Sequence, residues 1–210
     1  MKFDMQDKPT IMNRHHFSIL SILLVAILGG GCVITHTTSV EFKPNGNGPL
    51  AQIKPLTILV QVDDQRPEAE KEYLVQIVAD IGGTDRWNTE TPANQIVQDA
   101  LASEIAKCGH RVVTVPGQNV DASVKVSLKR FKALCAAKMF SCKVDSHVDA
   151  EIVVSSEVTK VTTPPFQISG DYQKSYGQFG AGQAKDVLSA ALAEFVHNLT
   201  FDSRLIESLQ

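Results

Sequence analysis

The chain has 210 residues, of which 43% are hydrophobic and 20% are charged, and its net charge at pH 7 is −3. This charge excludes a protein that binds nucleic acid or another polyanion through bulk positive charge. The length suits one domain with a hydrophobic core, preceded by a short leader.

The N-terminal part has the order of a secretory signal. A basic, His-rich patch at residues 13–16 precedes the mainly apolar residues 17–28, and three glycines then lead to Cys32. The apolar run is shorter than the roughly 20 residues of a spanning helix. The sequence therefore predicts a lipoprotein signal peptide over residues 1–31 and lipidation of Cys32, with Met12 as an alternative start of a more compact signal.

The cleavage site departs from the usual lipoprotein pattern, because Gly29 stands where a leucine is usual. Two alternatives therefore stay open: cleavage to a free periplasmic protein, and retention of the apolar run as an uncleaved anchor. An aspartate after the modified cysteine commonly retains a lipoprotein at the inner membrane, so Val33 favours the periplasmic face of the outer membrane over inner-membrane anchoring. Acyl chains such as palmitate on Cys32 would make the anchoring stable, because two or more chains suffice.

Residues 32–55 contain a Pro- and Gly-rich stretch at 44–49 and no sustained periodicity. This composition predicts a lipidated N-terminus followed by a flexible tether. We expect residues 56–210 to form a single periplasmic domain.

The first half of that domain shows two strand patterns and one helix pattern. Apolar and other residues alternate over 56–62, and a second apolar run covers 73–79. Thr91 and Pro92 are typical of a helix start, and Gly109 of a helix end. Between them, apolar residues recur at helical spacing: Ile96, Val97, Ala100, Leu101 and Ile105.

The second half begins with a short strand at 111–115 and continues with alternating patterns. Residues 122–128 and 148–154 alternate most clearly, which predicts an antiparallel hairpin, and residues 166–176 predict a third strand. A helix with one apolar stripe follows over 187–199, and Asp202 is typical of the cap of a short final helix. The predicted fold is α+β, a two-layer sandwich of a mainly antiparallel sheet packed by two amphipathic helices.

The cysteines other than Cys32 allow two interpretations. Cys135 and Cys142 flank a chain reversal, and disulfides form readily in an oxidising compartment. One interpretation is a Cys135–Cys142 disulfide with Cys108 as a core residue, and the other is three reduced thiols. A metal site is disfavoured, because the sequence contains no Cys-x-x-Cys pair.

The register of the predicted hairpin bears on this disulfide. Regular pairing that places Leu128 opposite Val148 or Ala150 does not place Cys135 opposite Cys142. It instead predicts one of two partners for Cys135, Ser141 or Lys143.

Candidate catalytic and metal-binding groups are few. Asp145, His147 and Asp149 alternate along a strand, which is typical of a solvated polar face and only weakly suggests a cation site. Asp63, Asp64 and Glu68 lie near Arg66 in the sequence. They could form an acid–base cluster, but a turn held by an Arg–carboxylate pair explains them at least as well. The common hydrolase and phosphate-binding motifs are absent from the sequence. We therefore predict no catalytic residue, no metal and no cofactor.

Two features suggest binding. Met139 and Phe140 stand at the predicted hairpin tip, where apolar side chains mark a partner contact unless they fold back onto the core. Trp87, the only tryptophan, is either a core anchor or an interface residue, and anchoring is favoured.

The order of elements resembles the YajG-type family of uncharacterised bacterial lipoproteins. The resemblance lies in residues 149–154, the strand at 170–176, the helix end at 201–205, the turn at 64–67 and the stretch at 81–83. It implies a lipid-anchored envelope protein, and it implies no catalytic residue.

Sequence and resemblance together predict a non-enzymatic lipoprotein that acts as an accessory or binding component of a cell-envelope assembly. Its expected partners are the membrane, through the lipid anchor, and an envelope protein, but not nucleic acid. The alternative is a periplasmic protein that binds a lipid or peptidoglycan fragment, and a hydrolase ranks third.

Overall fold

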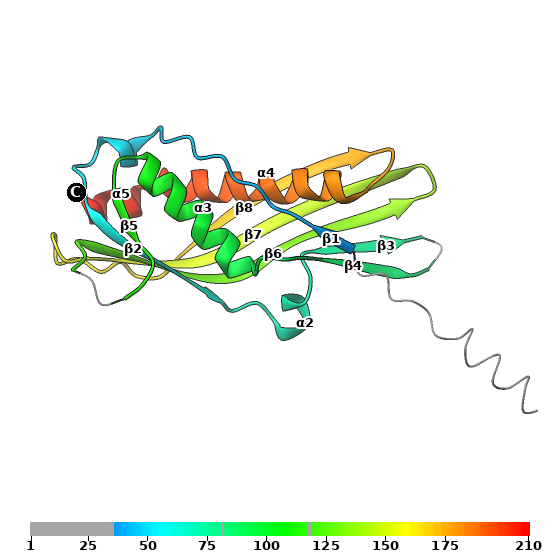
Figure 1. The fold of residues 1–210 in the computed structure, drawn as a ribbon, viewed down its shortest axis with the longest axis horizontal. Helices are drawn as coiled ribbons and strands as arrows, with labels where there is room; N and C mark the ends of the chain where they lie inside the picture. The colour runs from blue at the N-terminus through cyan, green and yellow to red at the C-terminus, as the bar shows by residue number, and fades with distance from the viewer. Residues whose placement is uncertain (1–35, 81, 117–118) are drawn as a thin grey trace, which may run out of the picture. The chain divides into compact units, whose positions relative to one another are not determined.

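The computed structural model describes residues 36–80, 82–116 and 119–210. The predicted signal peptide and Cys32 lie outside the described residues. Figure 1 shows the elements. They are β1 (His36–Thr38), the 3-10 helix η1 (Pro49–Gln52), β2 (Thr57–Asp64), α2 (Glu68–Lys71), β3 (Val75–Ala79), β4 (Thr84–Thr89), α3 (Ala93–Lys107), β5 (Arg111–Val113), β6 (Ala122–Lys138), β7 (Ser141–Ser156), β8 (Phe166–Tyr176), α4 (Ala181–Thr200) and α5 (Ser203–Leu209).

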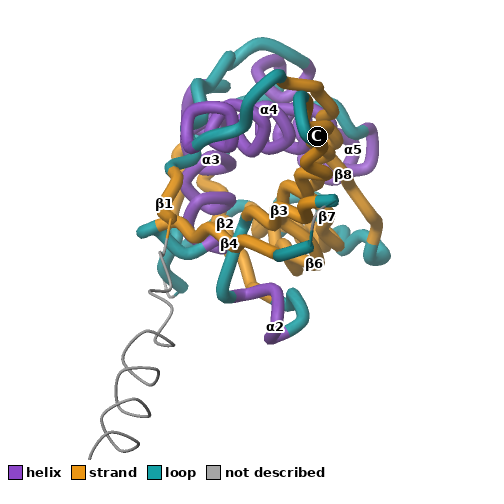
Figure 2. The backbone as a smooth tube through the Cα atoms, turned by 90° about the vertical axis from the view of Figure 1, so that its right-hand side faces the viewer, coloured by secondary structure: helices purple, strands orange, loops and turns teal. Residues whose placement is uncertain are grey.

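The strands form one mixed sheet, and two long helices pack against one of its faces. Helix α4 contacts β7 and β8, while α3 contacts β2 and β5. Figure 2 shows α3 and α4 together on one side of the strands and the short helix α2 on the other. The predicted α+β sandwich with two packed helices is confirmed.

Strand β6 pairs with three other strands of the sheet. Strand β2 pairs in parallel with the first half of β6, and β3 pairs in parallel with its second half. On its other side β6 pairs antiparallel with β7, which pairs with β8. Most paired residues are antiparallel, as predicted, but the parallel neighbours of β6 were not expected.

A bulge in β6 changes the register of the hairpin. Leu128 faces Ala150 as predicted, but the register shifts between Leu128 and Arg130. Cys135 consequently faces Val144, so its predicted partners are wrong. The extra residue of a bulge turns every later side chain to the opposite face relative to regular pairing.

Helix α4 lies very close to β8 at Gly170. A methyl group at this position would collide with the carbonyl oxygen of Ala191 and the backbone nitrogen of Phe195. The alternation of β8 places a residue without a side chain where the helix crosses the strand. The buried stripe of α4 can then pack directly on the sheet: Ala184, Val187, Leu188, Ala191, Leu192, Phe195, Val196 and Leu199.

The segment before β2 is part of the domain, so the predicted tether over residues 32–55 is wrong where the structure describes it. Strand β1 pairs with β4, and Leu50 is 1% exposed. The buried Glu104 carboxylate accepts the backbone N–H groups of Asn45 and Gly46 at 2.7 and 2.9 Å. The Pro- and Gly-rich composition allows tight turns here, and these long-range hydrogen bonds fix them. The domain therefore begins before residue 56.

A buried histidine fastens the same segment. The Nε2 atom of His110 lies 3.0 Å from the carbonyl oxygen of Leu50, and the backbone N–H of Leu56 donates to its Nδ1 at 3.2 Å. Both ring nitrogens of His110 thus contact the backbone of this segment, one at Leu50 within η1 and one at Leu56 after it.

Candidate functional site

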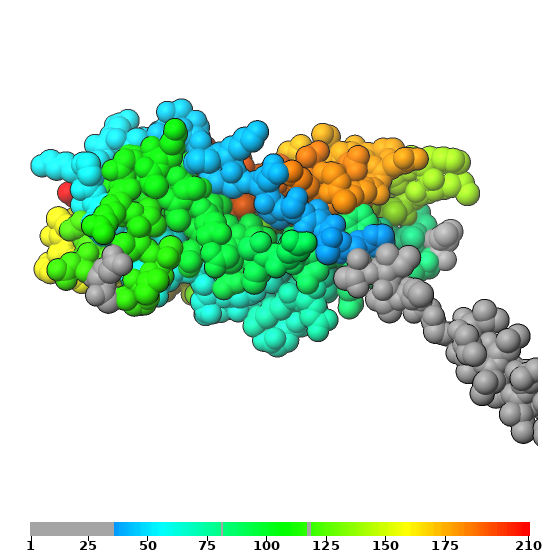
Figure 3. All heavy atoms as spheres, viewed as in Figure 1, coloured from blue at the N-terminus to red at the C-terminus, as the bar shows by residue number. Residues whose placement is uncertain are grey.

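The β6–β7 turn presents two large apolar side chains to solvent. Met139 and Phe140 lie between Lys138, the last residue of β6, and Ser141, the first of β7. They are 85% and 84% exposed, and the turn projects at one end of the domain (Figure 3). They do not fold back onto the core. We call Met139 and Phe140 the apolar tip.

A disulfide lies directly behind the apolar tip. Cys135 and Cys142 are joined across the hairpin with their Cα atoms 6.1 Å apart, and both side chains are buried. Cys142 faces Ala137, so the two cysteines are diagonal neighbours on the inward face of the sheet. The bulge in β6 creates this arrangement. Cys108 is a buried free thiol, and desolvation followed by the charge of Glu104 raises its pKa.

The hairpin segment that carries the apolar tip is apolar and basic, and the exposed Asp80 of the neighbouring strand connection donates its backbone N–H to Ala137 at 3.2 Å. Val78 and Leu134, on neighbouring strands at the same end of the sheet, are 42% and 39% exposed. Lys138 and Lys143 are the only charged residues between positions 137 and 143. The Nζ atom of Lys143 lies 3.8 Å from Asp145 Oδ1. Such a surface suits contact with a partner that is apolar and negatively charged.

Trp87 is a core anchor, as favoured from the sequence. It lies in β4, is 6% exposed, and stacks on Phe179 with ring centroids 5.7 Å apart. Its Nε1–H group donates to Asp85 Oδ2 at 2.7 Å. The indole ring of Trp87 therefore packs within the domain.

The buried Arg66 and the partly buried Asp64 form an ion pair at the corner between β2 and β3, which we call the Arg66 corner. Arg66 donates from Nε to Asp64 Oδ1 at 2.9 Å and from Nη2 to Asp64 Oδ2 at 2.8 Å. Its Nη1 donates to the carbonyl oxygens of Glu70 and Phe131 at 3.2 and 3.4 Å. Burial acts to raise the pKa of Asp64, but the hydrogen bonds and charge of Arg66 outweigh it, so that this pKa is lowered. The pair is built as an ion pair within a turn.

The three polar residues that alternate along β7, Asp145, His147 and Asp149, each have a different partner. His147 Nδ1 lies 2.5 Å from Asp171 Oδ1, Asp149 pairs with Arg130 at 3.2 Å, and Asp145 accepts from an amide on β8. Within residues 36–210, apart from the undescribed positions, no group of three or more His, Cys, Asp or Glu side chains is arranged to hold a metal ion.

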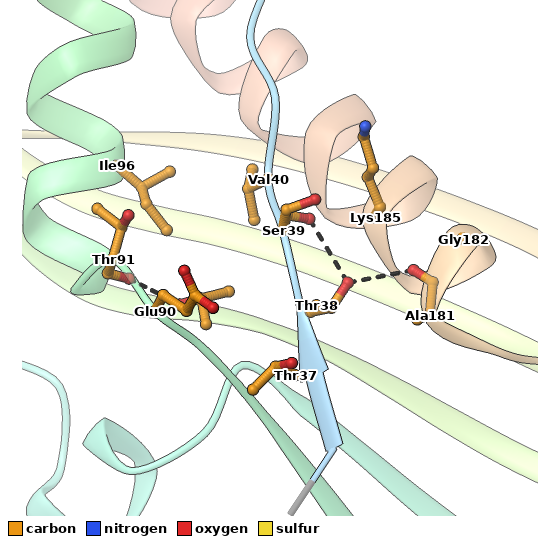
Figure 4. A pocket seen from close by; sticks show the side chains of 11 residues that line it. Thr37, Thr38, Ser39, Val40, Glu90, Thr91, Ile96, Ala181, Gly182 and Lys185 are labelled. Carbon is orange, nitrogen blue, oxygen red and sulfur yellow. Dashed lines mark hydrogen bonds between the residues drawn. The ribbon is translucent and has the colours of Figure 1, made fainter.

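A cleft of about 460 Å³ lies between β1, α3 and the start of α4 (Figure 4). The Thr38 hydroxyl donates to the carbonyl oxygen of Ala181 at 3.1 Å across its floor. Lys185 at its rim pairs with Glu41, and this hydrogen bond and charge lower the pKa of Glu41. The residues that line this cleft were not predicted from the sequence, because its wall at β1 falls in the predicted tether.

Most of the chain matches a known protein family. The family described as uncharacterized lipoprotein matches residues 51–210. The chain belongs to this lipoprotein family. The predicted resemblance to uncharacterised bacterial lipoproteins is thereby confirmed, whereas no curated protein matches the chain.

The chain is similar to solved structures at low sequence identity. A Xanthomonas campestris protein of the DUF330 family is similar with a TM-score of 0.56 and 11% identity, covering 79% of this chain and 91% of the other. A lipoprotein of Neisseria meningitidis has a TM-score of 0.36 and 10% identity, covering 65% and 94%. The similarity to the Xanthomonas protein is one of fold alone. Among the described residues, no helix has the length and apolar character needed to cross a membrane.

Proposed function

We propose that this lipoprotein is anchored through Cys32 on the periplasmic face of the outer membrane and acts without catalysis. Its role is that of an accessory or binding component of a cell-envelope assembly. The observation that carries the proposal is the exposure of Met139 and Phe140 at a hairpin end that a disulfide closes. Large apolar side chains grouped at a surface are typical of contact sites.

The charged groups in the interior support a non-catalytic role. Arg66 is occupied by Asp64 and by two carbonyl oxygens, and Glu104 is occupied by two backbone N–H groups. A catalytic acid or base must be able to reach a substrate proton. These groups instead hold neighbouring segments of the chain together.

A photo-crosslinking residue at position 140 in the lipoprotein of intact cells tests the contact. We expect it to form a covalent product with an envelope component, and the same residue at the exposed Val158 in the β7–β8 connection to give none. Equal labelling at both positions, or none at position 140, would contradict a contact role for the apolar tip.

The anchor has its own test in cell fractionation. We expect the native protein in the outer-membrane fraction and the Cys32→Ala variant in the soluble periplasm. Native protein that is found free in the periplasm, or in the inner membrane, would contradict the proposed location.

The cleft of Figure 4 favours one second candidate, the binding of a small ligand between sheet and helices. Thermal stabilisation of the protein by lipid or peptidoglycan fragments would support it. Stabilisation should then be lost in a Gly182→Leu variant, because Gly182 lines the cleft and has open space around its Cα atom.

A further inference from the structure

We propose that the apolar tip contacts the lipid headgroup layer of the membrane in which the protein is anchored. This inference rests on the proposed lipidation of Cys32 and names the partner of the same contact site. Three observations support it: the level of the tip relative to the start of β1, the length of chain between β1 and Cys32, and the charge around the tip.

The pairing of the strands fixes the first relation. His36 pairs with Trp87, Trp87 with Val75, and Val75 with Ala133, so these four residues lie at one level across the sheet. Strand β6 continues from Ala133 towards Met139, and at 3.3 Å per residue the apolar tip lies about 20 Å beyond this level. Strand β1 runs away from the tip (Figure 1). The chain thus enters the domain at the end that bears the apolar tip.

The covalent chain limits where the anchor can be. Three residues separate Cys32 from His36, and four residue steps extend at most about 14 Å. A membrane surface that holds Cys32 therefore lies within about 14 Å of His36. With the strands along the membrane normal, the apolar tip, about 20 Å beyond the level of His36, reaches that surface. The opposite end of β6, at Ala122, lies about 36 Å from the level of His36 and beyond the anchor's reach.

The charge around the tip matches a bacterial membrane. Lys138 and Lys143 flank Met139 and Phe140, and positions 137–143 contain no acidic residue. The nearby exposed Asp80, whose backbone N–H donates to Ala137, offsets one of these two positive charges. Lysine side chains can keep their ammonium groups at anionic headgroups while neighbouring apolar side chains enter the boundary below. Phe140 and Met139 supply the apolar area that such a contact buries.

The hairpin is also pre-organised for this contact. The disulfide between Cys135 and Cys142 closes the hairpin behind the turn, and both cysteines are buried. A rigid turn loses less conformational entropy on binding than a mobile loop. The tip can therefore contact lipid while the rest of the domain keeps its fold.

Tryptophan fluorescence of the full-length lipidated protein tests the inference. The protein is reconstituted in vesicles of phosphatidylethanolamine and phosphatidylglycerol, with and without bromine on the acyl chains. We compare Phe140→Trp with the matched control Val158→Trp, both at exposed positions, and subtract the emission of the native Trp87. A side chain that is buried about 5–10 Å into the headgroup–acyl boundary comes close to the brominated acyl chains. We expect most of the added emission at position 140 to be quenched and that at position 158 to be unaffected.

Several outcomes would overturn the inference. Emission at position 140 that bromine leaves unchanged, in protein that floats with the vesicles, shows that the anchor is present and the tip is not in lipid. A blue-shifted but unquenched emission at position 140 shows a protein partner or a second copy instead. Protein that does not float with the vesicles lacks the anchor, and both the inference and the proposed function then fail. Thermal unfolding of each variant verifies that the fold is intact.

Discussion

The Arg66 corner buries a charged side chain against Phe131 of β6, whereas the apolar tip, in the turn that follows β6, exposes two hydrophobic ones. Arg66 is 4% exposed and Phe140 is 84% exposed. Each arrangement costs free energy unless a partner compensates it. Arg66 has its partners within the chain, in Asp64 and two carbonyl oxygens. The apolar tip has no comparable cover in the described chain, so we assign the corner to stability and the tip to contact.

Removing the buried charge should have the largest effect on stability. Arg66→Ala leaves Asp64 and two carbonyl oxygens without their donor, and breaking such a buried pair costs about 3–5 kcal/mol. We expect urea unfolding to show this loss. The exposed Arg111 is the matched control, and Arg111→Ala should stay within about 0.5 kcal/mol. Equal losses of stability in Arg66→Ala and Arg111→Ala would contradict a structural role of the Arg66 corner.

Adding a methyl group where α4 lies close to β8 should have the next largest effect on stability. Gly170→Ala forces the helix away from the sheet, and we expect the free energy of unfolding to fall by about 3 kcal/mol. Gly177→Ala is the control, because a methyl group there meets nothing within 4 Å. Thermal unfolding of both variants measures the difference, and an unchanged stability of Gly170→Ala would mean that helix and strand are further apart.

The disulfide should contribute less, because it closes a short loop. Cysteines seven residues apart are worth about 2 kcal/mol in a chain-entropy estimate. We expect urea unfolding of the native protein under reducing conditions to show this loss. The Cys135→Ala/Cys142→Ala double variant should show no further effect of reductant. A native protein that is insensitive to reductant would indicate that these two thiols are not bonded.

Acid should weaken the Arg66 corner in particular. Because the pKa of Asp64 is lowered in the folded state, its contribution is complete above the unfolded value and is lost as the pH falls through the folded one. We expect stability to fall below about pH 4. Asp64→Asn should show a shallower fall over the same range in unfolding experiments. Parallel pH profiles of stability for the native protein and the variant would show that the ionisation of Asp64 does not contribute to stability.

The apolar tip should matter least for stability. Met139→Ser/Phe140→Ser changes two exposed side chains, so the free energy of unfolding should stay within about 0.5 kcal/mol of the native value. The same double change should abolish crosslinking from a photoreactive group placed at Lys138. A large loss of stability would show instead that the tip packs on the domain, and the contrast with the Arg66 corner would disappear.

Local patterns predicted much of the fold. Alternation over 122–128 and 148–154 identified β6 and β7 and their inward faces, and the apolar stripe over 187–199 identified α4. These signals are visible in sequence because each depends only on the period of one element and on one buried face. The position of Met139 and Phe140 at a hairpin tip followed from the same pattern.

Features that depend on distant contacts could not be predicted. The turns at Asn45 and Gly46 resemble a flexible linker until the carboxylate of Glu104, nearly sixty residues later, accepts their N–H groups. The parallel pairing of β2 and β3 with β6 is equally non-local. The bulge after Leu128 has no clear sequence signal, yet it decides which face the cysteines occupy.

The central claim is that this lipoprotein is held to a membrane at the end of the domain where the apolar tip lies. The mass of the N-terminal peptide of protein purified from membranes, compared with a Cys32→Ala variant, tests it most directly. The account predicts a peptide that begins at Cys32 and carries acyl chains, and no such peptide from the variant. An unmodified Cys32, or a peptide that retains residues 17–28, would contradict it.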